Sequence, residues 1–148
     1  MKIYCGTDII EVERVKKAIL NTPKFKEKIF TPTEIAYAET KRDVTKYQHY
    51  AGRFAAKEAV YKSIAAIYPH IELGEIEIVN DISNLNRPKV IIHNKNFMEF
   101  AKDFTIDVSI SHIKEYASAN SIAIFLQCTR IAFIYTLTAC SVLLSHNI

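Results

Sequence analysis

Three short stretches of this 148-residue chain carry the side chains best suited to chemistry. They are residues 6–11 (Gly-Thr-Asp-Ile-Ile-Glu), 53–59 (Arg-Phe-Ala-Ala-Lys-Glu-Ala) and 109–112 (Ser-Ile-Ser-His). Asp8 ends an apolar run, where an acid is costly to bury unless it meets a cation or a metal ion. If Asp8 and Glu58 converge, two hard oxygen ligands with room for water and phosphate oxygens describe a Mg²⁺ site rather than a Zn²⁺ site.

The second stretch supplies cations beside Glu58. On a helix, Phe54, Glu58 and Lys62 share one face, and Arg53 and Lys57 line the adjoining face. Cations next to a Mg²⁺ site would bind phosphate, which is the layout of phosphoryl transfer. A plainer alternative makes Glu58 and Lys62 an ordinary surface pair spaced by four, with the other cations solvated.

Asp8 and His112 have similar alternatives. Asp8 could simply be a carboxylate near the N-terminus of the helix that follows it. His112 could hydrogen-bond a phosphate or relay a proton, but a histidine after a strand is more often a turn residue satisfied by backbone groups. Local sequence alone does not separate these readings.

The elements that must position these residues are an N-terminal strand and a long helix. Residues 2–10 read as a strand, and a helix follows from Glu11 to the stop at 21–23. Residues 31–34 (Thr-Pro-Thr-Glu) predict a capped helix to about residue 41, and residues 47–67 predict a long Ala-rich helix. A hairpin over 76–92, a short helix near 97–101 and strands at 106–111 and 116–125 complete an α+β pattern of helices packed on an antiparallel sheet.

The pattern divides the chain into a domain over residues 1–125 and an apolar extension over 126–148. Residues 131–144 carry no charge and follow Arg130, but a bilayer span needs roughly 20 apolar residues. We therefore rank protein packing above membrane contact for the extension.

Composition narrows the class of protein. A net charge of +3 falls short of the dense basic stripe of a nucleic-acid binder. Cys5, Cys128 and Cys140 form no metal-binding pattern and suggest reduced thiols in a cytoplasmic protein, and the early charged residues do not fit a signal peptide.

Together the three stretches resemble the holo-(acyl-carrier-protein) synthases, small 4′-phosphopantetheinyl transferases. Their marks are a G-x-D-I-x-E strand end and an F-x-x-K-E-A helix, here Gly6–Glu11 and Phe54–Ala59. The resemblance runs from about residue 3 to 125 and extends to Arg14, Pro88 and the Ser-x-Ser-His strand. Either main motif alone would be weak, but both in this order and spacing are specific.

The resemblance implies a homotrimer with active sites at subunit interfaces, acting in fatty acid biosynthesis. The phosphopantetheine arm of coenzyme A would pass to a serine of apo acyl carrier protein, and Asp8 and Glu58 would hold Mg²⁺. Lys62 would neutralise phosphate, Glu58 or a metal-bound water would take the serine proton, and Arg14 would grip the carrier. The coenzyme pocket would be lined by Arg53, Lys57, Lys62, Ser111 and His112.

The chain departs from the family pattern in two turns, at residues 63–69 in place of a Gly-rich turn and at residues 85–88 in place of N-G-K-P. These changes bear on coenzyme affinity more than on the metal site. Two rivals stay open: a catalytically idle module that docks an acidic protein through Arg14, Lys16 and Lys17, and a protein anchored to a membrane by residues 131–144. Retention of both Asp8 and Glu58 favours the enzyme over the idle module.

Overall fold

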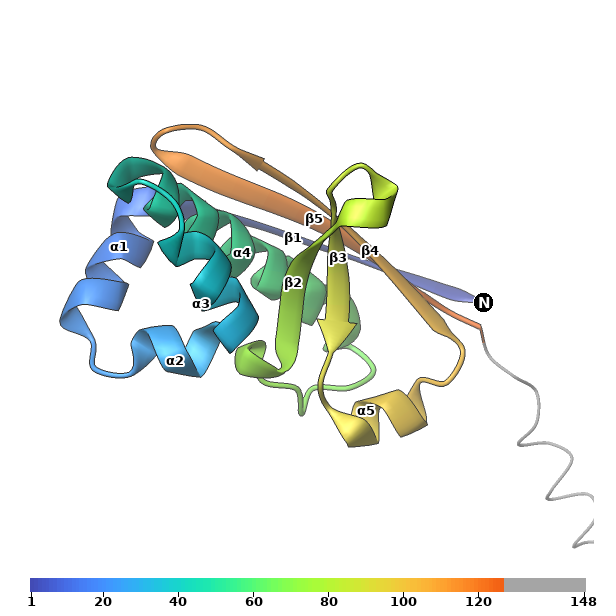
Figure 1. Cartoon of the computed structure of the whole chain (residues 1–148). Helices are drawn as coiled ribbons and strands as arrows, with labels where there is room; N and C mark the ends of the chain where they lie inside the picture. The colour runs from blue at the N-terminus through green and yellow to red at the C-terminus, as the bar shows by residue number, and fades with distance from the viewer. Residues whose placement is uncertain (127–148) are drawn as a thin grey trace, which may run out of the picture.

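The computed structural model describes residues 1–126, in which helices pack on one face of an antiparallel sheet (Figure 1). The predicted α+β class is confirmed. The elements, in chain order, are β1 (Lys2–Glu11), α1 (Val12–Asn21), α2 (Phe25–Ile29), α3 (Pro32–Glu39), α4 (Asp43–Ile64), η1 (Leu73–Glu75), β2 (Ile76–Asp81), η2 (Ile82–Asn84), β3 (Arg87–Ile92), α5 (Lys95–Phe100), β4 (Phe104–His112) and β5 (Tyr116–Phe125).

The main sheet has the strand order β1-β5-β4, with both pairings antiparallel. Its register places Asp8 of β1 opposite Ala119 of β5, and Ala119 opposite Ile110 of β4. The strands β2 and β3 form a separate hairpin, and β3 lies beside β4. A salt bridge of 3.0 Å from Arg87 to Asp107 joins the hairpin to the sheet.

The long helix α4 packs on the sheet through small side chains. Its four alanines between positions 51 and 59 are fully buried, and they face the buried small residues of β5, which are Ala117, Ala119, Ser121 and Ala123. Gly6 of β1 comes closest: a Cβ atom there would lie 1.9 Å from the carbonyl oxygen of Ala59. Because no side chain fits between them, β1 and α4 are held at a fixed separation that positions Asp8 two residues along the strand.

We expect Gly6→Ala to destabilise the fold by about 3 kcal/mol or more, because rigid backbone rather than a flexible side chain blocks the added methyl group. Gly52→Ala is the matched control, since its Cβ would lie 3.2 Å from a side-chain atom of Ile110 and alanine favours a helix over glycine. Thermal unfolding of both variants checks this. Equal melting temperatures would contradict the close approach of β1 and α4.

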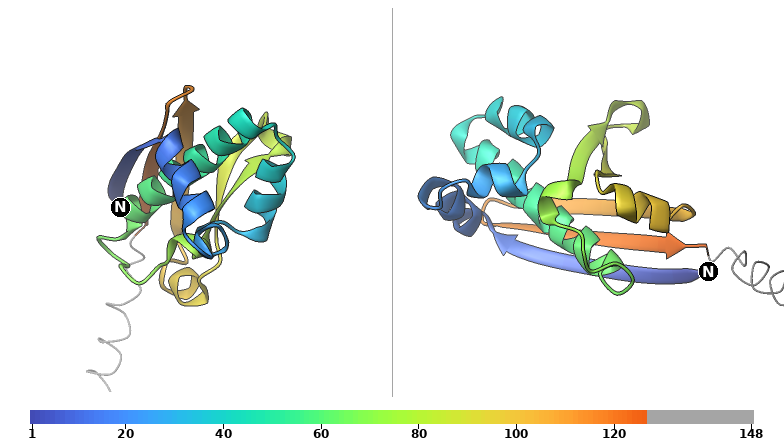
Figure 2. Two further views of the ribbon diagram at one scale, coloured as in Figure 1. Left: turned by 90° about the vertical axis from the view of Figure 1, so that its left-hand side faces the viewer. Right: turned by 90° about the horizontal axis from the view of Figure 1, so that it is seen from below.

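The second face of the main sheet carries no helix within residues 1–126, because the helices pack on the other face (Figure 2). Strand alternation directs Ile3, Ile9 and Ile122 to this face, where they are 55%, 67% and 48% exposed. We call this set the outer sheet face. An antiparallel sheet tolerates water on one side, and here that side carries exposed isoleucines.

The local predictions succeed where a short-range signal exists. The capping box is present: the Thr31 side chain accepts from the amide of Glu34, whose carboxylate accepts from the amide of Thr31. Helix α2 was not predicted, and α4 begins and ends earlier than the expected 47–67.

No helix within the described part of the chain combines the length and apolar character that crossing a bilayer requires. The extension over residues 131–144 lies outside the described residues.

The turn between β2 and β3 carries backbone strain. Leu85 and Asn86 have φ angles of 54° and 58°, the left-handed region that glycine and asparagine adopt most readily. The family's N-G pair would meet this requirement at lower cost than a leucine does. The departure noted in the sequence therefore places a strained, exposed leucine at this tip.

Candidate active site

Asp8, Glu58 and Lys62 form an acidic cluster between β1 and α4. The Lys62 ammonium donates to Asp8 Oδ1 at 2.8 Å and to the carbonyl oxygen of Thr7 at 3.1 Å. Lys62 therefore pairs with Asp8 across 54 residues of sequence rather than forming the helical pair with Glu58 that the plainer alternative required. The predicted convergence of Asp8 with the α4 motif is present.

Two acids and one cation leave this cluster with one net negative charge when both acids are ionised. Burial raises the pKa of Glu58, repulsion from Asp8 raises it further, and attraction to Lys62 opposes both effects. Glu58 therefore protonates at a higher pH than an isolated carboxyl group. A bound cation would offset the repulsion between the two carboxylates. They fit a Mg²⁺ ion, which commonly takes one or two carboxylates and completes its coordination shell with water and phosphate oxygens.

The acidic cluster opens into a hollow of about 410 Å³ that Arg14 shares. Asp8, Glu58 and the exposed Arg14 line it together with apolar side chains that include Phe25 and Phe54. The predicted partner-binding residue therefore lies beside the predicted metal ligands. Phe25 was missed because α2 itself was not predicted.

A second, basic hollow lies on the other flank of α4. Its walls include Arg53, His49 and His112, with Tyr37 and Asn80 beside them. The ring of His49 stands edge-on to those of Tyr37 and His112, with centroids 5.3 and 6.1 Å apart. Burial, with repulsion from Arg53, lowers the pKa of His49 to about 4, so its ring is neutral at pH 7.

Helix α4 separates the two hollows. Arg53 and Glu58 are five residues apart, which places them about 140° apart around the helix. Asp8 lies on the edge strand β1 and His112 on the opposite edge strand β4, with β5 and α4 between them. One chain therefore does not bring Asp8, Glu58 and Lys62 together with Arg53 and His112.

A family model described as the 4′-phosphopantetheinyl transferase superfamily matches residues 4–124. The chain belongs to this superfamily. A related holo-[acyl-carrier-protein] synthase from Ruminiclostridium cellulolyticum is 45% identical over 126 residues, covering 82% of this chain and 92% of that protein. The resemblance predicted from the motifs is confirmed.

Solved structures of phosphopantetheinyl transferases share the fold. The Chronobacterium ammoniagenes ACPS-CoA complex superposes with a TM-score of 0.73 at 25% identity, covering 86% of this chain and 100% of that one. A holo-(acyl-carrier-protein) synthase from Bacillus anthracis, in complex with CoA (3′,5′-ADP), gives a TM-score of 0.66 at 32% identity, covering 81% and 94%.

Three of the predicted coenzyme-binding residues, Lys57, Lys62 and Ser111, line neither hollow of this transferase. The Lys57 side chain has no exposed surface, and its ammonium forms a salt bridge with Glu34. Ser111 alternates with Ile110 and His112, so it points to the outer sheet face. Lys57 is thus a buried structural cation in this chain, which corrects its placement on a ligand-facing side of α4.

Sequence reasoning missed three residues of the basic hollow. His49 lies one helical turn before Arg53, and this spacing of four was a usable signal. Tyr37 and Asn80 come from α3 and β2, and their approach to Arg53 depends on tertiary packing that no local pattern encodes.

Proposed function

We propose that this chain is a cytoplasmic holo-(acyl-carrier-protein) synthase. It transfers 4′-phosphopantetheine from coenzyme A to a serine of apo acyl carrier protein and releases adenosine 3′,5′-bisphosphate. The observation that carries the proposal is the acidic cluster, because two carboxylates and a lysine meet beside a hollow that a carrier-facing arginine shares. Relatives named for this activity cover most of the chain and support it.

The reaction is a displacement at the β-phosphorus of coenzyme A. The serine oxygen forms a bond to that phosphorus, and the bond to the bridging oxygen of adenosine 3′,5′-bisphosphate breaks. Asp8 and Glu58 would hold Mg²⁺. When bound, this ion would neutralise charge on the pyrophosphate of coenzyme A. Lys62 adds a positive charge that a phosphate can reach, since its side chain is 48% exposed.

The proton of the attacking serine would go to Glu58 or to a water held by the bound ion. Incubating the protein with apo carrier, coenzyme A and Mg²⁺ tests the activity. Mass spectrometry should detect a phosphopantetheine adduct on the carrier, and its absence under all Mg²⁺ concentrations would contradict the proposal.

The enzyme acts as a homotrimer whose active sites lie between subunits. Support comes from two features: the exposed isoleucines of the outer sheet face, and the separation of the acidic cluster from the basic hollow by α4. A head-to-tail contact joins two different surfaces, and it forms a closed ring when the rotation between neighbouring subunits closes. The acidic cluster of one subunit would then face the basic hollow of the next, where Arg53 and His112 would bind coenzyme A.

We expect Arg14→Glu to raise the KM for carrier protein at least about tenfold and to change the KM for coenzyme A much less. Arg14 is exposed on α1 at the mouth of the acidic cluster, so it can meet an acidic carrier surface. Lys24→Glu, an exposed change of equal charge outside this hollow, serves as the control. Steady-state kinetics at two salt concentrations measures both constants, and equal increases for both substrates would remove Arg14 from the docking surface.

We expect a chain ending at Phe125 to keep its activity, with kcat/KM within about threefold of the full-length value, because residues 1–125 contain every proposed site residue. The domain boundary at residue 125 is part of this proposal. Transfer assays and sizing chromatography on both chains provide the measurement. Complete loss of activity on truncation would show that residues 126–148 belong to the working fold.

A further inference from the structure

Glu34 and Lys57 form a buried ion pair between α3 and α4, and neither charge belongs to the proposed chemistry. Their exposed fractions are 1% and 0%, and the Lys57 ammonium lies 2.6 Å from Glu34 Oε2. The carboxylate also accepts from the amides of Thr31 and Ile78, at 2.8 and 2.9 Å. The ammonium donates to the carbonyl oxygens of Ile29 and Leu73 at 2.6 and 3.3 Å.

Every donor of Lys57 and both oxygens of Glu34 therefore have partners. Through these hydrogen bonds the pair connects four segments: the end of α2, the start of α3, the η1 turn and β2. Burying two charges is expensive, and apolar residues of similar size often stabilise a fold as well. Stability alone therefore accounts poorly for an ion pair at this place.

Tyr37 lies one helical turn beyond Glu34 on α3 and contacts Arg53. The Arg53 guanidinium carbon lies 4.5 Å from the centre of the Tyr37 ring. Asn80 of β2 completes the contact, because it accepts from Arg53 Nη2 at 3.3 Å and donates to the Tyr37 hydroxyl at 3.3 Å. The same two elements that Glu34 joins to Lys57, α3 and β2, thus hold Arg53.

Arg53 has a hydrogen-bond donor that a ligand in the basic hollow could use. Only 6% of the residue is exposed, yet it lines the basic hollow, and its buried Nε has no hydrogen-bond partner among the described residues. Burial lowers the Arg53 pKa, and the negative charge of Glu34 is the largest effect that counters this. Glu34 therefore supports two cations on α4, Lys57 by direct contact and Arg53 at longer range.

We infer that Glu34 and Lys57 are positioning residues for Arg53. Their ion pair locks α3 and β2 against α4, so that Tyr37 and Asn80 hold the guanidinium at the wall of the basic hollow. The inference rests on the proposed function, since it assigns Arg53 to coenzyme A. The ion pair acts only through Arg53 and touches neither substrate.

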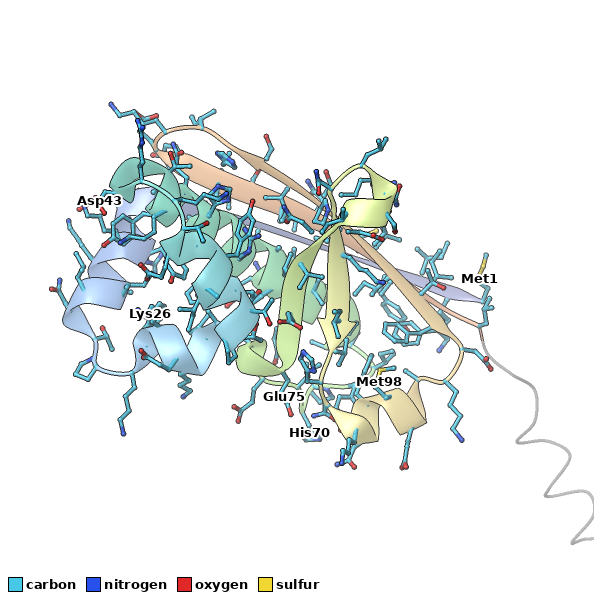
Figure 3. All side chains as sticks on the ribbon, viewed as in Figure 1. Met1, Lys26, Asp43, His70, Glu75 and Met98 are labelled. Atoms are coloured by element: carbon cyan, nitrogen blue, oxygen red, sulfur yellow. The ribbon has the colours of Figure 1, made fainter. Side chains whose placement is uncertain are left out.

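A double-mutant cycle tests this. The paired variant, Glu34→Gln with Lys57→Met, removes both charges together and avoids leaving one buried and uncompensated. It is made in the wild-type and in the Arg53→Ala background. Glu39→Gln is the matched control, because Glu39 also lies on α3 but pairs with Lys26 and Lys46 rather than with Lys57 (Lys26 is labelled in Figure 3).

The readouts are the Kd for coenzyme A by calorimetry, kcat, the KM for each substrate, and the melting temperature. We expect the paired variant to weaken coenzyme A binding roughly tenfold in the wild-type background and less than about twofold in the Arg53→Ala background. The KM for carrier protein and the Glu39→Gln control should stay near wild type. Equal weakening in both backgrounds, or a lower melting temperature with unchanged coenzyme affinity, would overturn the inference.

A second variant covers the case in which the paired variant does not fold. Tyr37→Leu leaves the ion pair intact and removes the ring that contacts Arg53 and His49. It should weaken coenzyme A binding by a similar factor and again fail to add to Arg53→Ala. Wild-type affinity in Tyr37→Leu would overturn the inference. A wild-type protein that transfers nothing contradicts the proposed function instead, and the calorimetric cycle still reports on the positioning of Arg53.

Discussion

Asp8→Asn and Glu58→Gln should each lower kcat/KM for transfer by about 10²- to 10³-fold, the effect of losing one electrostatic stabiliser of a transition state. Both substitutions keep side-chain shape while removing a charged oxygen ligand. Folding should change little, since Asp8 loses one partly exposed salt bridge to Lys62 and such pairs contribute little. Glu58→Gln removes repulsion from Asp8 and should leave stability equal or slightly higher.

Transfer rates across a Mg²⁺ titration and melting temperatures together measure these effects. Glu13→Gln provides the control, because Glu13 is an exposed acid at the start of α1 and lines neither the acidic cluster nor the basic hollow. Both active-site variants should remain defective at saturating carrier and coenzyme A. Near wild-type turnover at limiting Mg²⁺ would refute the metal assignment.

Mixing two inactive variants should restore activity. Asp8→Asn damages only the acidic cluster and Arg53→Ala only the basic hollow, and α4 keeps these regions apart within one chain. If each active site combines the acidic cluster of one subunit with the basic hollow of the next, random mixing of equal amounts regenerates roughly a quarter of the intact sites. Neither variant alone should approach this rate.

The mixed trimers can be made by co-expression with two different affinity tags and purified through both, which removes the homotrimers and leaves one intact site among the three of each mixed ring. Asp8→Asn mixed with Glu58→Gln is the matched control, because both changes damage the same cluster and one subunit must supply both acids. Recovery in the control, or none in the test mixture, would contradict a site shared between subunits. A further change of Ile122→Glu on the outer sheet face should make the protein elute at a larger volume, as a smaller species, and abolish recovery, since it puts a charge into the proposed interface.

Local signals in the sequence predicted much of the fold. Thr31 and Glu34 predicted the start of α3 through a capping box that the structure contains. The apolar alternation of Ile76 and Ile78 predicted β2, and the run after Ile106 predicted β4. These features depend on neighbours a few residues away, which a single sequence displays directly.

Other features depend on long-range packing and were not predictable in this way. Lys57 shares a motif with Glu58, and helical spacing alone allowed it a ligand-facing role. The covering segments α2, α3 and η1 bury it instead, and its partner Glu34 comes from 23 residues earlier in the chain. Motif position thus located the acidic cluster correctly, but it did not reveal which flank of α4 each neighbouring cation would occupy.

The close approach at Gly6 has a genetic consequence. Every missense change in a glycine codon introduces a residue with a Cβ atom, and at Gly6 that atom would meet the backbone of Ala59. The usual distinction between conservative and radical replacements therefore disappears at this codon. A mutational scan should find position 6 intolerant of all nineteen alternatives, whereas exposed Thr7 beside it should accept many.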